Sequence, residues 1–307
     1  MNLIFVAFGL IALLFGGDLL VRGAVGVARR FGVSPLVIGL TLVGFGTSAP
    51  ELVTSLSAAL AGSPAIALGN VVGSNIANIL LILGVAALIR PVAAQMSALP
   101  REALWVGGSA LLLAGLSLLG QIGTAAGAGL LGLLGLYLWG AFRSSTPPDL
   151  DVDLSAPLDA LPGSALRLVG GLALTIGGAI ALVDGATGIA RAYGVPEAVI
   201  GLTLVAIGTS LPELATTVMA ARRGQSDVAL GNILGSGIFN ILGILGTTAL
   251  VVPLPIDTLI IRDIWIMVAT TALLLGMLFW RAQISRATGA AFLLVYAGYM
   301  VWLSQTF

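Results

Sequence analysis

Long apolar stretches separated by short polar connections set the pattern of this chain. A helix that spans a membrane needs about 20 largely apolar residues. The pattern predicts ten such helices, at residues 3–27, 35–61, 65–89, 101–119, 123–142, 165–190, 197–221, 227–250, 258–279 and 287–305. The first is too long for the apolar region of a signal peptide and lacks a basic start and a small-residue cleavage site, so we expect it to be a mature spanning helix. We therefore expect an all-α polytopic membrane protein with ten transmembrane helices.

One connection differs from the others because it is polar, rich in proline and acidic. It covers residues 144–163 and carries four aspartates, Asp149, Asp151, Asp153 and Asp159. It divides the chain into two parts with five predicted helices each, at residues 1–143 and 164–307.

Composition agrees with this picture and narrows the chemistry. The chain is 58% hydrophobic and 8% charged, whereas soluble domains have about 25% charged residues. It has no cysteine and no histidine, which excludes disulfides, thiol chemistry, imidazole proton relays, and haem or zinc sites built from those residues. We expect no cofactor. Ion chemistry must use oxygen ligands, which suit Ca²⁺, Na⁺ or Mg²⁺. The net charge is zero and there is no basic run, so no nucleic-acid partner is expected.

The basic residues, all of them arginine, predict the orientation in the membrane. Arg191 and Arg262 fall on one side of the ten-helix pattern and Arg22 lies inside the first helix. The other side receives Arg29, Arg30, Arg90, Arg101, Arg143, Arg167, Arg222, Arg223, Arg281 and Arg286. Cytoplasmic loops carry the excess of Arg and Lys. Both termini should therefore be extracytoplasmic, with the acidic linker cytoplasmic, in a cell inner (plasma) membrane.

The chain contains an internal repeat. A shift of 162 residues aligns Gly39–Gly84 with Gly201–Gly246 without a gap, and about 28 of the 46 positions are identical. Because five helices is an odd number, the second copy enters the membrane from the opposite side, so two inverted five-helix repeats are expected. Secondary transporters have such repeats and bind their substrates where the repeats meet. A channel can also be built this way.

Each repeat contains a break signal inside a predicted helix. In GFGTSAPEL, Pro50 and two glycines predict a break at Thr47–Ser48. The restart, SAPE, ends on Glu51 and matches a capping box with proline in the first turn, and SLPE repeats it with Glu213.

The two glutamates are the main candidate site residues. They could serve only as helix caps, but a carboxylate at the bilayer centre costs several kcal/mol and a neutral Gln would cap equally well. A pair of repeat-related carboxylates at helix breaks favours a cation site. Unwound backbone carbonyls could add oxygens, together with the hydroxyls of Thr47, Ser48, Thr209 and Ser210.

A second polar stripe lies in the helices 65–89 and 227–250. Its members are Gly69, Gly73, Ser74 and Asn78 in the first copy, and Gly231, Gly235, Ser236 and Asn240 in the second. Close helix packing explains the glycines, and amide hydrogen bonds explain Asn70 and Asn232. We interpret Ser74, Asn78, Ser236 and Asn240 as cation ligands.

Two aspartates, Asp18 and Asp184, also lie inside predicted helices but are not equivalent in the repeat. Asp18 and Arg22 have i,i+4 spacing, which predicts a local ion pair near a helix end. An intramembrane aspartyl protease built from these aspartates is disfavoured, because FGGD and LVDG are not a convincing signature and the glutamate repeat would stay unexplained.

The paired motifs, GTSAPE with GNVVGSNIANI and GTSLPE with GNILGSGIFNI, resemble the alpha repeats of the sodium/calcium exchanger family. The resemblance implies a prokaryotic antiporter that exchanges Na⁺ for Ca²⁺, acts as a monomer and has only a minimal linker. It implies that Glu51 and Glu213 are the main calcium ligands. It further implies that the first and sixth helices slide across a core made of the second, third, seventh and eighth. The remaining implied ligands of the sodium and calcium sites are Thr47, Ser48, Ser74, Asn78, Thr209, Ser210, Ser236, and the carbonyls before each break, at Gly44 and Ala206.

One position departs from the family pattern. Many sodium/calcium exchangers carry an aspartate where this chain has Asn240, the equivalent of Asn78. The central site then has two carboxylates, which match one Ca²⁺ or two Na⁺ in charge. The alternatives left open are a proton-coupled exchanger of Ca²⁺ or another cation, and a passive cation channel.

Overall fold

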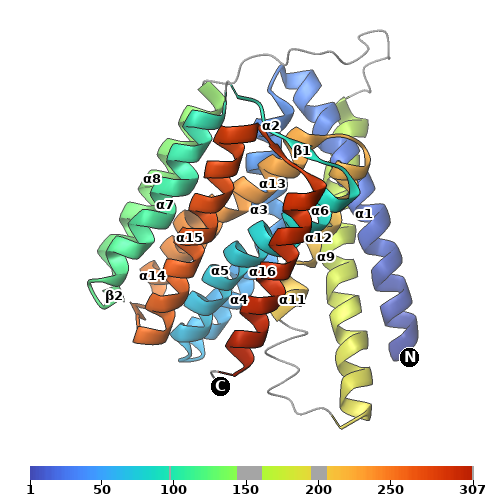
Figure 1. Ribbon diagram of the computed structural model, residues 1–307. Coiled ribbons are helices and arrows are strands. Elements are labelled where there is room, and N and C mark those ends of the chain that lie inside the picture. Colours follow the sequence, from blue (N-terminus) through green and yellow to red (C-terminus); the bar gives the residue numbers. More distant parts are fainter. Residues whose placement is uncertain (97, 144–160, 195–205, 306–307) are drawn as a thin grey trace.

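The computed structural model describes residues 1–96, 98–143, 161–194 and 206–305, which are mostly helical (Figure 1). Three segments, named η1, η2 and η4, are π-helical turns within longer helices. The elements of the first half are α1 Asn2–Phe31, α2 Pro35–Ile38, η1 Gly39–Val43, α3 Gly44–Thr47, α4 Ala49–Leu60, α5 Pro64–Ala77, η2 Asn78–Ile82, α6 Leu83–Ile89, β1 Val92–Ala93, α7 Leu99–Ser117, β2 Gln121–Ile122 and α8 Thr124–Arg143.

The second half repeats this order. Its described elements are α9 Leu161–Ala192, α11 Ala206–Thr209, α12 Leu211–Arg222, α13 Ser226–Ile238, η4 Phe239–Leu245, α14 Gly246–Val251, β3 Leu254–Pro255, α15 Thr258–Arg281, β4 Gln283–Ile284 and α16 Arg286–Ser304.

Each predicted helix is helical over most of its described residues, apart from the turns at Ser48 and Ser210 and a residue or two at some ends. Seven helices among the described residues are long and apolar enough to cross a membrane, and a bent pair, Pro35–Thr47 with Ala49–Leu60, makes an eighth. The predicted helix 101–119 is α7, which has 19 residues and is not among these eight. The start of the predicted helix 197–221 lies outside the described residues, as does most of the linker 144–163.

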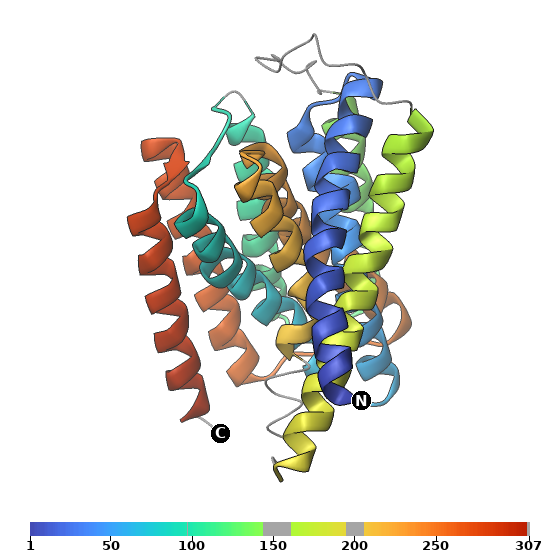
Figure 2. The same ribbon diagram turned by 90° about the vertical axis from the view of Figure 1, so that its right-hand side faces the viewer.

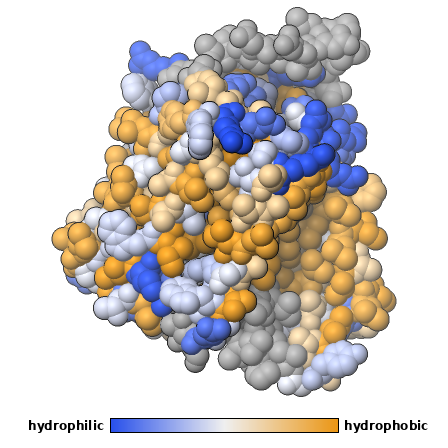
Figure 3. All heavy atoms as spheres, in the orientation of Figure 1, coloured by the Kyte–Doolittle hydropathy of each residue, from blue (hydrophilic) through white to orange (hydrophobic). Residues whose placement is uncertain are grey.

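The helices form an inner group surrounded by an outer one. The segments Pro64–Ile89 and Ser226–Val251 are mostly buried, whereas α8, α9, α15 and α16 keep much of their surface exposed. Large apolar side chains such as Phe15, Leu104 and Leu294 lie exposed on the outer helices. Hydrophobic side chains cover the broad middle of the face in Figure 3, as expected of a surface that contacts lipid.

The longest helices, α1 and α9, lie against each other along their whole length at one side of the molecule (Figure 2). Glycines allow this approach: a Cβ at Gly23 would lie 2.3 Å from the backbone N of Leu168, and one at Gly9 would lie 2.6 Å from the Gly178 carbonyl. These contacts make the two helices antiparallel. Small residues let helix backbones approach closely inside a membrane.

A second close contact joins the two halves. The run from η1 to α3 packs on α13, where a Cβ at Gly235 would lie 2.1 Å from the Leu40 carbonyl and one at Gly44 would lie 2.9 Å from the Ser236 N. Gly231 meets the backbone of Leu36 and Gly39 in the same way. The predicted close packing through glycines is confirmed at Gly231 and Gly235, whereas no described backbone comes this close to Gly69 or Gly73.

Two short antiparallel strand pairs also join the halves. β1 pairs with β4, with Val92 opposite Ile284, and β2 pairs with β3, with Ile122 opposite Leu254. β1 lies toward one end of the molecule and β2 toward the other (Figure 1). Met1 and the last turn of α16 lie at the same end as β2, opposite the ends of α8 and α9 that flank residues 144–160.

Candidate cation-binding site

The predicted helix break is present at Ser48. The axes of Pro35–Thr47 and Ala49–Leu60 differ by 43°, and Ser48 has φ −83° and ψ 8°. Ser210, its repeat equivalent, has nearly the same backbone, with φ −89° and ψ 5°. In each copy the break is followed at once by a proline in the first turn of the next helix, which brings Glu51 and Glu213 to equivalent positions.

The predicted capping boxes are wrong. Neither Ser48 nor Ser210 caps the helix that it precedes. The Ser48 hydroxyl instead donates to Oε1 of Glu213 at 2.8 Å, and the Ser210 hydroxyl donates to Oε1 of Glu51 at 3.1 Å. An N-cap residue needs an extended backbone to aim its oxygen at the first turn, and ψ near zero turns these hydroxyls away. The carboxylate of the opposite repeat is also a stronger, charged acceptor.

Both glutamates are buried, with 1% of each side chain exposed. One oxygen of each carboxylate accepts a serine hydroxyl, whereas Oε2 of Glu51 and Oε2 of Glu213 have no hydrogen-bond partner among the described residues. The same holds for Oδ1 of Asn78 and Oδ1 of Asn240, which are also buried. Two carboxylate and two amide oxygens, one of each from each repeat, are thus buried acceptors without donors. Such acceptors are costly unless a donor or a cation satisfies them.

The helices that carry these four oxygens pack on one another. α4, which contains Glu51, contacts η4, which contains Asn240. α12, which contains Glu213, likewise contacts η2, which contains Asn78. The four side chains therefore come from crossed pairs of helices, each pair with one member from each half.

Two further asparagines fasten the glutamate turns. The Asn70 amide donates to the Glu51 carbonyl at 3.3 Å and to the Ser55 hydroxyl at 2.9 Å. The Asn232 amide repeats this with the Glu213 carbonyl at 3.3 Å and the Thr217 hydroxyl at 2.9 Å. The interpretation of Asn70 and Asn232 as packing residues with amide hydrogen bonds is confirmed.

The remaining predicted ligands differ in their surroundings. The Thr47 hydroxyl donates to Asn232 Oδ1 at 3.1 Å and to the Gly44 carbonyl at 3.3 Å, and the Ser236 hydroxyl donates to the same carbonyl at 3.1 Å. The backbone at Gly44 is helical rather than unwound, because the Ser48 N–H also reaches this oxygen at 3.1 Å. The expectation of an unwound Gly44 carbonyl is therefore wrong.

Three other predicted ligands, Ser74, Thr209 and Ala206, are placed by their burial or their position in a helix. Ser74 and Thr209 are buried near these groups in sequence. Ala206 is the first residue of α11, so the carbonyl predicted at that break lies at the edge of the described residues.

A third buried glutamate, Glu102 on α7, has a different environment. Its Oε1 accepts from Arg101 Nε at 2.8 Å, and its Oε2 accepts from the Tyr137 hydroxyl at 3.4 Å. Both oxygens are engaged by protein donors, unlike those of Glu51 and Glu213. Within the described residues no group of three or more acidic side chains could hold a metal ion, so the candidate site has two carboxylates.

Asp18 and Asp184, the two aspartates of the disfavoured protease hypothesis, lie far apart. Asp18 pairs with Arg22 at 2.7 Å, as predicted, and also with Arg223, although it lies in the middle of α1 rather than near its end. Gly171 of α9 packs on the turn before Leu20, which places Asp184 roughly 13 residues further along α9, or about 20 Å away. These residues cannot form a dyad.

Asn75 was missed as a site residue. Its side chain is 4% exposed and accepts a hydrogen bond from the Asn240 amide at 2.9 Å. The repeat held a signal, because Asn75 aligns with Gly237 where the neighbouring residues match.

Comparisons with known proteins give the family. Residues 1–143 and 163–305 match the family model described as "Sodium/calcium exchanger protein". The inner membrane protein YrbG of Escherichia coli is 38% identical over 310 residues, covering 97% of this chain and 94% of YrbG. The sodium/calcium exchanger MaX1 of Methanosarcina acetivorans is 34% identical over 343 residues, covering 98% of each.

Solved structures agree with the sequence comparisons. The sodium-calcium exchanger NCX_Mj, soaked with zero Na⁺ and Ca²⁺, superposes on this chain with a TM-score of 0.88 at 33% identity, covering 98% of each chain. The same protein soaked with 10 mM Na⁺ and 10 mM Sr²⁺ gives 0.87, covering 98% of this chain and 97% of NCX_Mj. The chain therefore belongs to the sodium/calcium exchanger family, whose members are transporters of Na⁺ and Ca²⁺ and not enzymes.

Proposed function

We propose that this protein is a secondary antiporter that exchanges Na⁺ for Ca²⁺ at a site between its two halves. The observation that carries this proposal is the set of four buried oxygens without donors, on Glu51, Glu213, Asn78 and Asn240. Oxygen is the ligand atom that both ions prefer, and Ca²⁺ takes six to eight oxygens. The further ligands are Thr47, Ser48, Ser74, Thr209, Ser210 and Ser236, with the carbonyl of Ala206.

Charge favours competition between the two ions. The site holds two carboxylates, and one Ca²⁺ or two Na⁺ neutralise them equally, whereas a third Na⁺ leaves a net positive charge in a low dielectric. Asn240 contributes an amide oxygen without adding a charge. We therefore expect an exchange of two Na⁺ for one Ca²⁺ at the central site.

We propose that ten transmembrane helices in two inverted five-helix repeats hold this site. The strands support the inversion: β1 and β3 occupy equivalent positions in the repeat, yet β1 pairs toward one end of the molecule and β3 is paired with β2 toward the other. The crossed serine–glutamate hydrogen bonds support the same symmetry.

Alternating access couples the two fluxes in this proposal. α1 and α9 pack closely on each other through glycine, and they slide as a pair across the helices that carry the ligands. The empty site, with two uncompensated carboxylates, resists this movement because buried unpaired charge is costly. Either cation relieves that cost. In this proposal both termini are outside and residues 144–163 are cytoplasmic, which the arginine distribution supports, and the protein acts as a monomer.

The first prediction tests the two carboxylates. Glu51→Gln and Glu213→Gln should each abolish uptake of radiolabelled Ca²⁺ into proteoliposomes loaded with Na⁺, because each removes half of the negative charge that holds the cation. Glu102→Gln is the matched control, since Glu102 is equally buried but engaged by Arg101 and Tyr137. It should retain uptake. Wild-type uptake in both Glu51→Gln and Glu213→Gln would contradict the proposal.

The same vesicles separate the rival functions. A sodium gradient at constant pH, a pH gradient without sodium, and a calcium gradient alone are imposed in turn. Uptake driven by the pH gradient and indifferent to sodium identifies a proton-coupled exchanger. Uptake down the calcium gradient with no stimulation by a counter-ion identifies a channel.

A further inference from the structure

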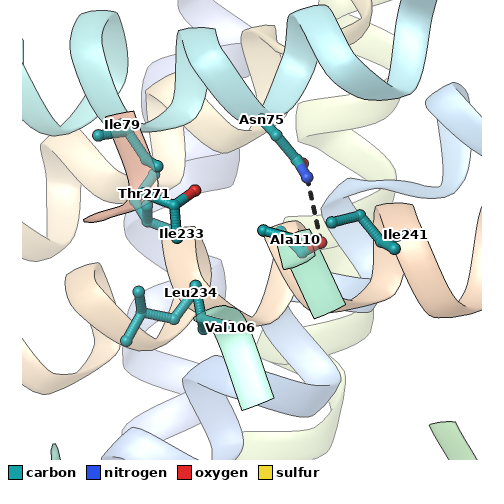
Figure 4. A pocket seen from close by; sticks show the side chains of 9 residues that line it. Asn75, Ile79, Val106, Ala110, Ile233, Leu234, Ile241 and Thr271 are labelled. Carbon is teal, nitrogen blue, oxygen red and sulfur yellow. Dashed lines mark hydrogen bonds between the residues drawn. The ribbon is translucent and has the colours of Figure 1, made fainter. Parts of the chain in front are cut away.

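Hydrogen bonds join the side chains of Asn240 and Asn75 and the Gly237 carbonyl in series. Asn75, on α5, donates from Nδ2 to the Gly237 carbonyl at 3.3 Å and to the Met267 sulfur at 3.5 Å. Its Oδ1 accepts from Nδ2 of Asn240 at 2.9 Å. Figure 4 shows Asn75 pointing from its helix into a small cavity that Thr271 also lines, with the bond to the carbonyl drawn as a dashed line.

The donors and acceptors in this series of hydrogen bonds can be arranged in only one way. A backbone carbonyl such as that of Gly237 can only accept, so Asn75 must face it with its NH₂ group. Asn75 Oδ1 then faces Asn240, so Asn240 must donate from its own NH₂ group. The free atom at the end is Oδ1 of Asn240, which is buried and has no partner among the described residues. A backbone group thus fixes which end of the Asn240 amide is left for a ligand.

The equivalent chain is missing in the other half. The repeat partner of Asn75 is Gly237, which has no side chain to offer to Asn78. Asn78 makes no side-chain hydrogen bond to any described residue, and its Oδ1 is also without a partner. One of these two amides is therefore held in orientation by a described side chain, and its repeat equivalent is not.

We propose that Asn75 is a positioning residue that holds the Asn240 carbonyl oxygen toward the cation and so raises the affinity for Ca²⁺. This inference rests on the proposed function, because it assumes that Asn240 is a ligand. Without Asn75 the Asn240 amide can turn its NH₂ group toward the cation, which repels it. Partners that orient a metal ligand typically contribute about 10- to 100-fold to metal affinity.

The first arm of the test changes Asn75 alone. Asn75→Leu keeps the branched shape of the side chain but removes the acceptor, and should raise the half-saturating Ca²⁺ concentration of sodium-driven uptake about tenfold. Asn75→Asp loses the bond to the Gly237 carbonyl but keeps an acceptor for Asn240, so it should lose less affinity than Asn75→Leu. Thr271→Val is the control, because its hydroxyl lines the same cavity and donates only to Met267 within its own helix. Equal losses in Asn75→Leu and Asn75→Asp would overturn the inference.

The second arm separates orientation from packing. In an Asn240→Asp background both side-chain atoms at residue 240 are oxygens, so no partner is needed to select one. Asn75→Leu should then cost nothing, or even restore affinity by removing an oxygen that faces the new carboxylate. A merely structural role of Asn75 would cost the same in both backgrounds, which a double-mutant cycle detects. That additive result would overturn the inference.

Calorimetry of Ca²⁺ binding to the detergent-solubilised protein distinguishes failure of the proposed function from failure of the proposed role of Asn75. Absence of binding and of uptake in the wild type would refute the proposed function itself. A normal wild type with an unchanged Asn75→Leu variant would refute only the role of Asn75.

Discussion

At the scale of single residues, the two glutamates of the candidate site differ from buried Glu102 in whether hydrogen-bond donors reach their carboxylate oxygens. Glu102 is as buried as Glu51, but protein donors reach both of its oxygens. Glu51 and Glu213 each keep one oxygen without a donor. Burial alone would therefore identify three candidate glutamates, whereas a carboxylate oxygen without a donor distinguishes Glu51 and Glu213 from Glu102.

The same comparison predicts a stability effect at Glu102. Arg101→Ala leaves the buried Glu102 carboxylate with only the long bond from Tyr137, and an unsatisfied buried polar group costs about 1–3 kcal/mol, with a charged group costing more. The detergent-solubilised variant should melt several degrees below wild type. In the double variant Arg101→Ala with Glu102→Gln most of this loss should disappear, because no charge is left to satisfy. An equal loss in the single and double variants would contradict this assignment.

At the scale of elements, glycines decide which helices can approach. The position of each glycine matters more than their number, as Gly235 and Gly237 show two residues apart on α13. A Cβ at Gly235 would lie 2.1 Å from the Leu40 carbonyl, whereas a Cβ at Gly237 would have only Asn75 Oδ1 nearby, at 4.0 Å.

This pair gives a matched prediction. Gly235→Ala should prevent stable folding, because its methyl group would enter the backbone of η1. Gly237→Ala should fold and gain about 0.5–1 kcal/mol, because alanine has less conformational freedom to lose in a helix. Thermal unfolding and membrane yield of the two variants check both outcomes. Similar melting temperatures for the two variants would show that the contact between α13 and η1 is loose.

At the scale of the whole molecule, hydrophobicity predicted a helical membrane protein correctly, because each span must satisfy its own backbone in lipid. It could not predict the ends of α1 and α9, which extend beyond the predicted segments, since helices outside the hydrocarbon need no apolar sequence. The short strands Val92–Ala93 and Leu254–Pro255 carry too little pattern to be recognised.

The sequence supplied the candidate site residues but not their contacts. The repeat identified Glu51 and Ser48 as a pair within one motif, whereas Ser48 bonds to the glutamate of the other motif. A contact between segments 165 residues apart depends on how the halves pack, and local spacing contains no information about that. The role of Asn75 depends on the same packing.

The topology of the whole chain is open to a direct test. The sequence has no cysteine, so single cysteines can be introduced without a background signal. A cysteine at Asn2 should react with a membrane-impermeant maleimide on intact cells, whereas one at Ser155 should react only after the membrane is permeabilised. The arginine distribution is the reason for this expectation. The reverse pattern would invert the proposed orientation.

The two strand pairs have a consequence for how the chain is built. Each of these two sheets takes one strand from the first half and one from the second, and each glutamate takes its serine donor from the opposite half. Neither half alone can complete a sheet or a carboxylate environment. The repeat is therefore a unit of sequence, whereas both sheets and both carboxylate environments are shared between its two copies.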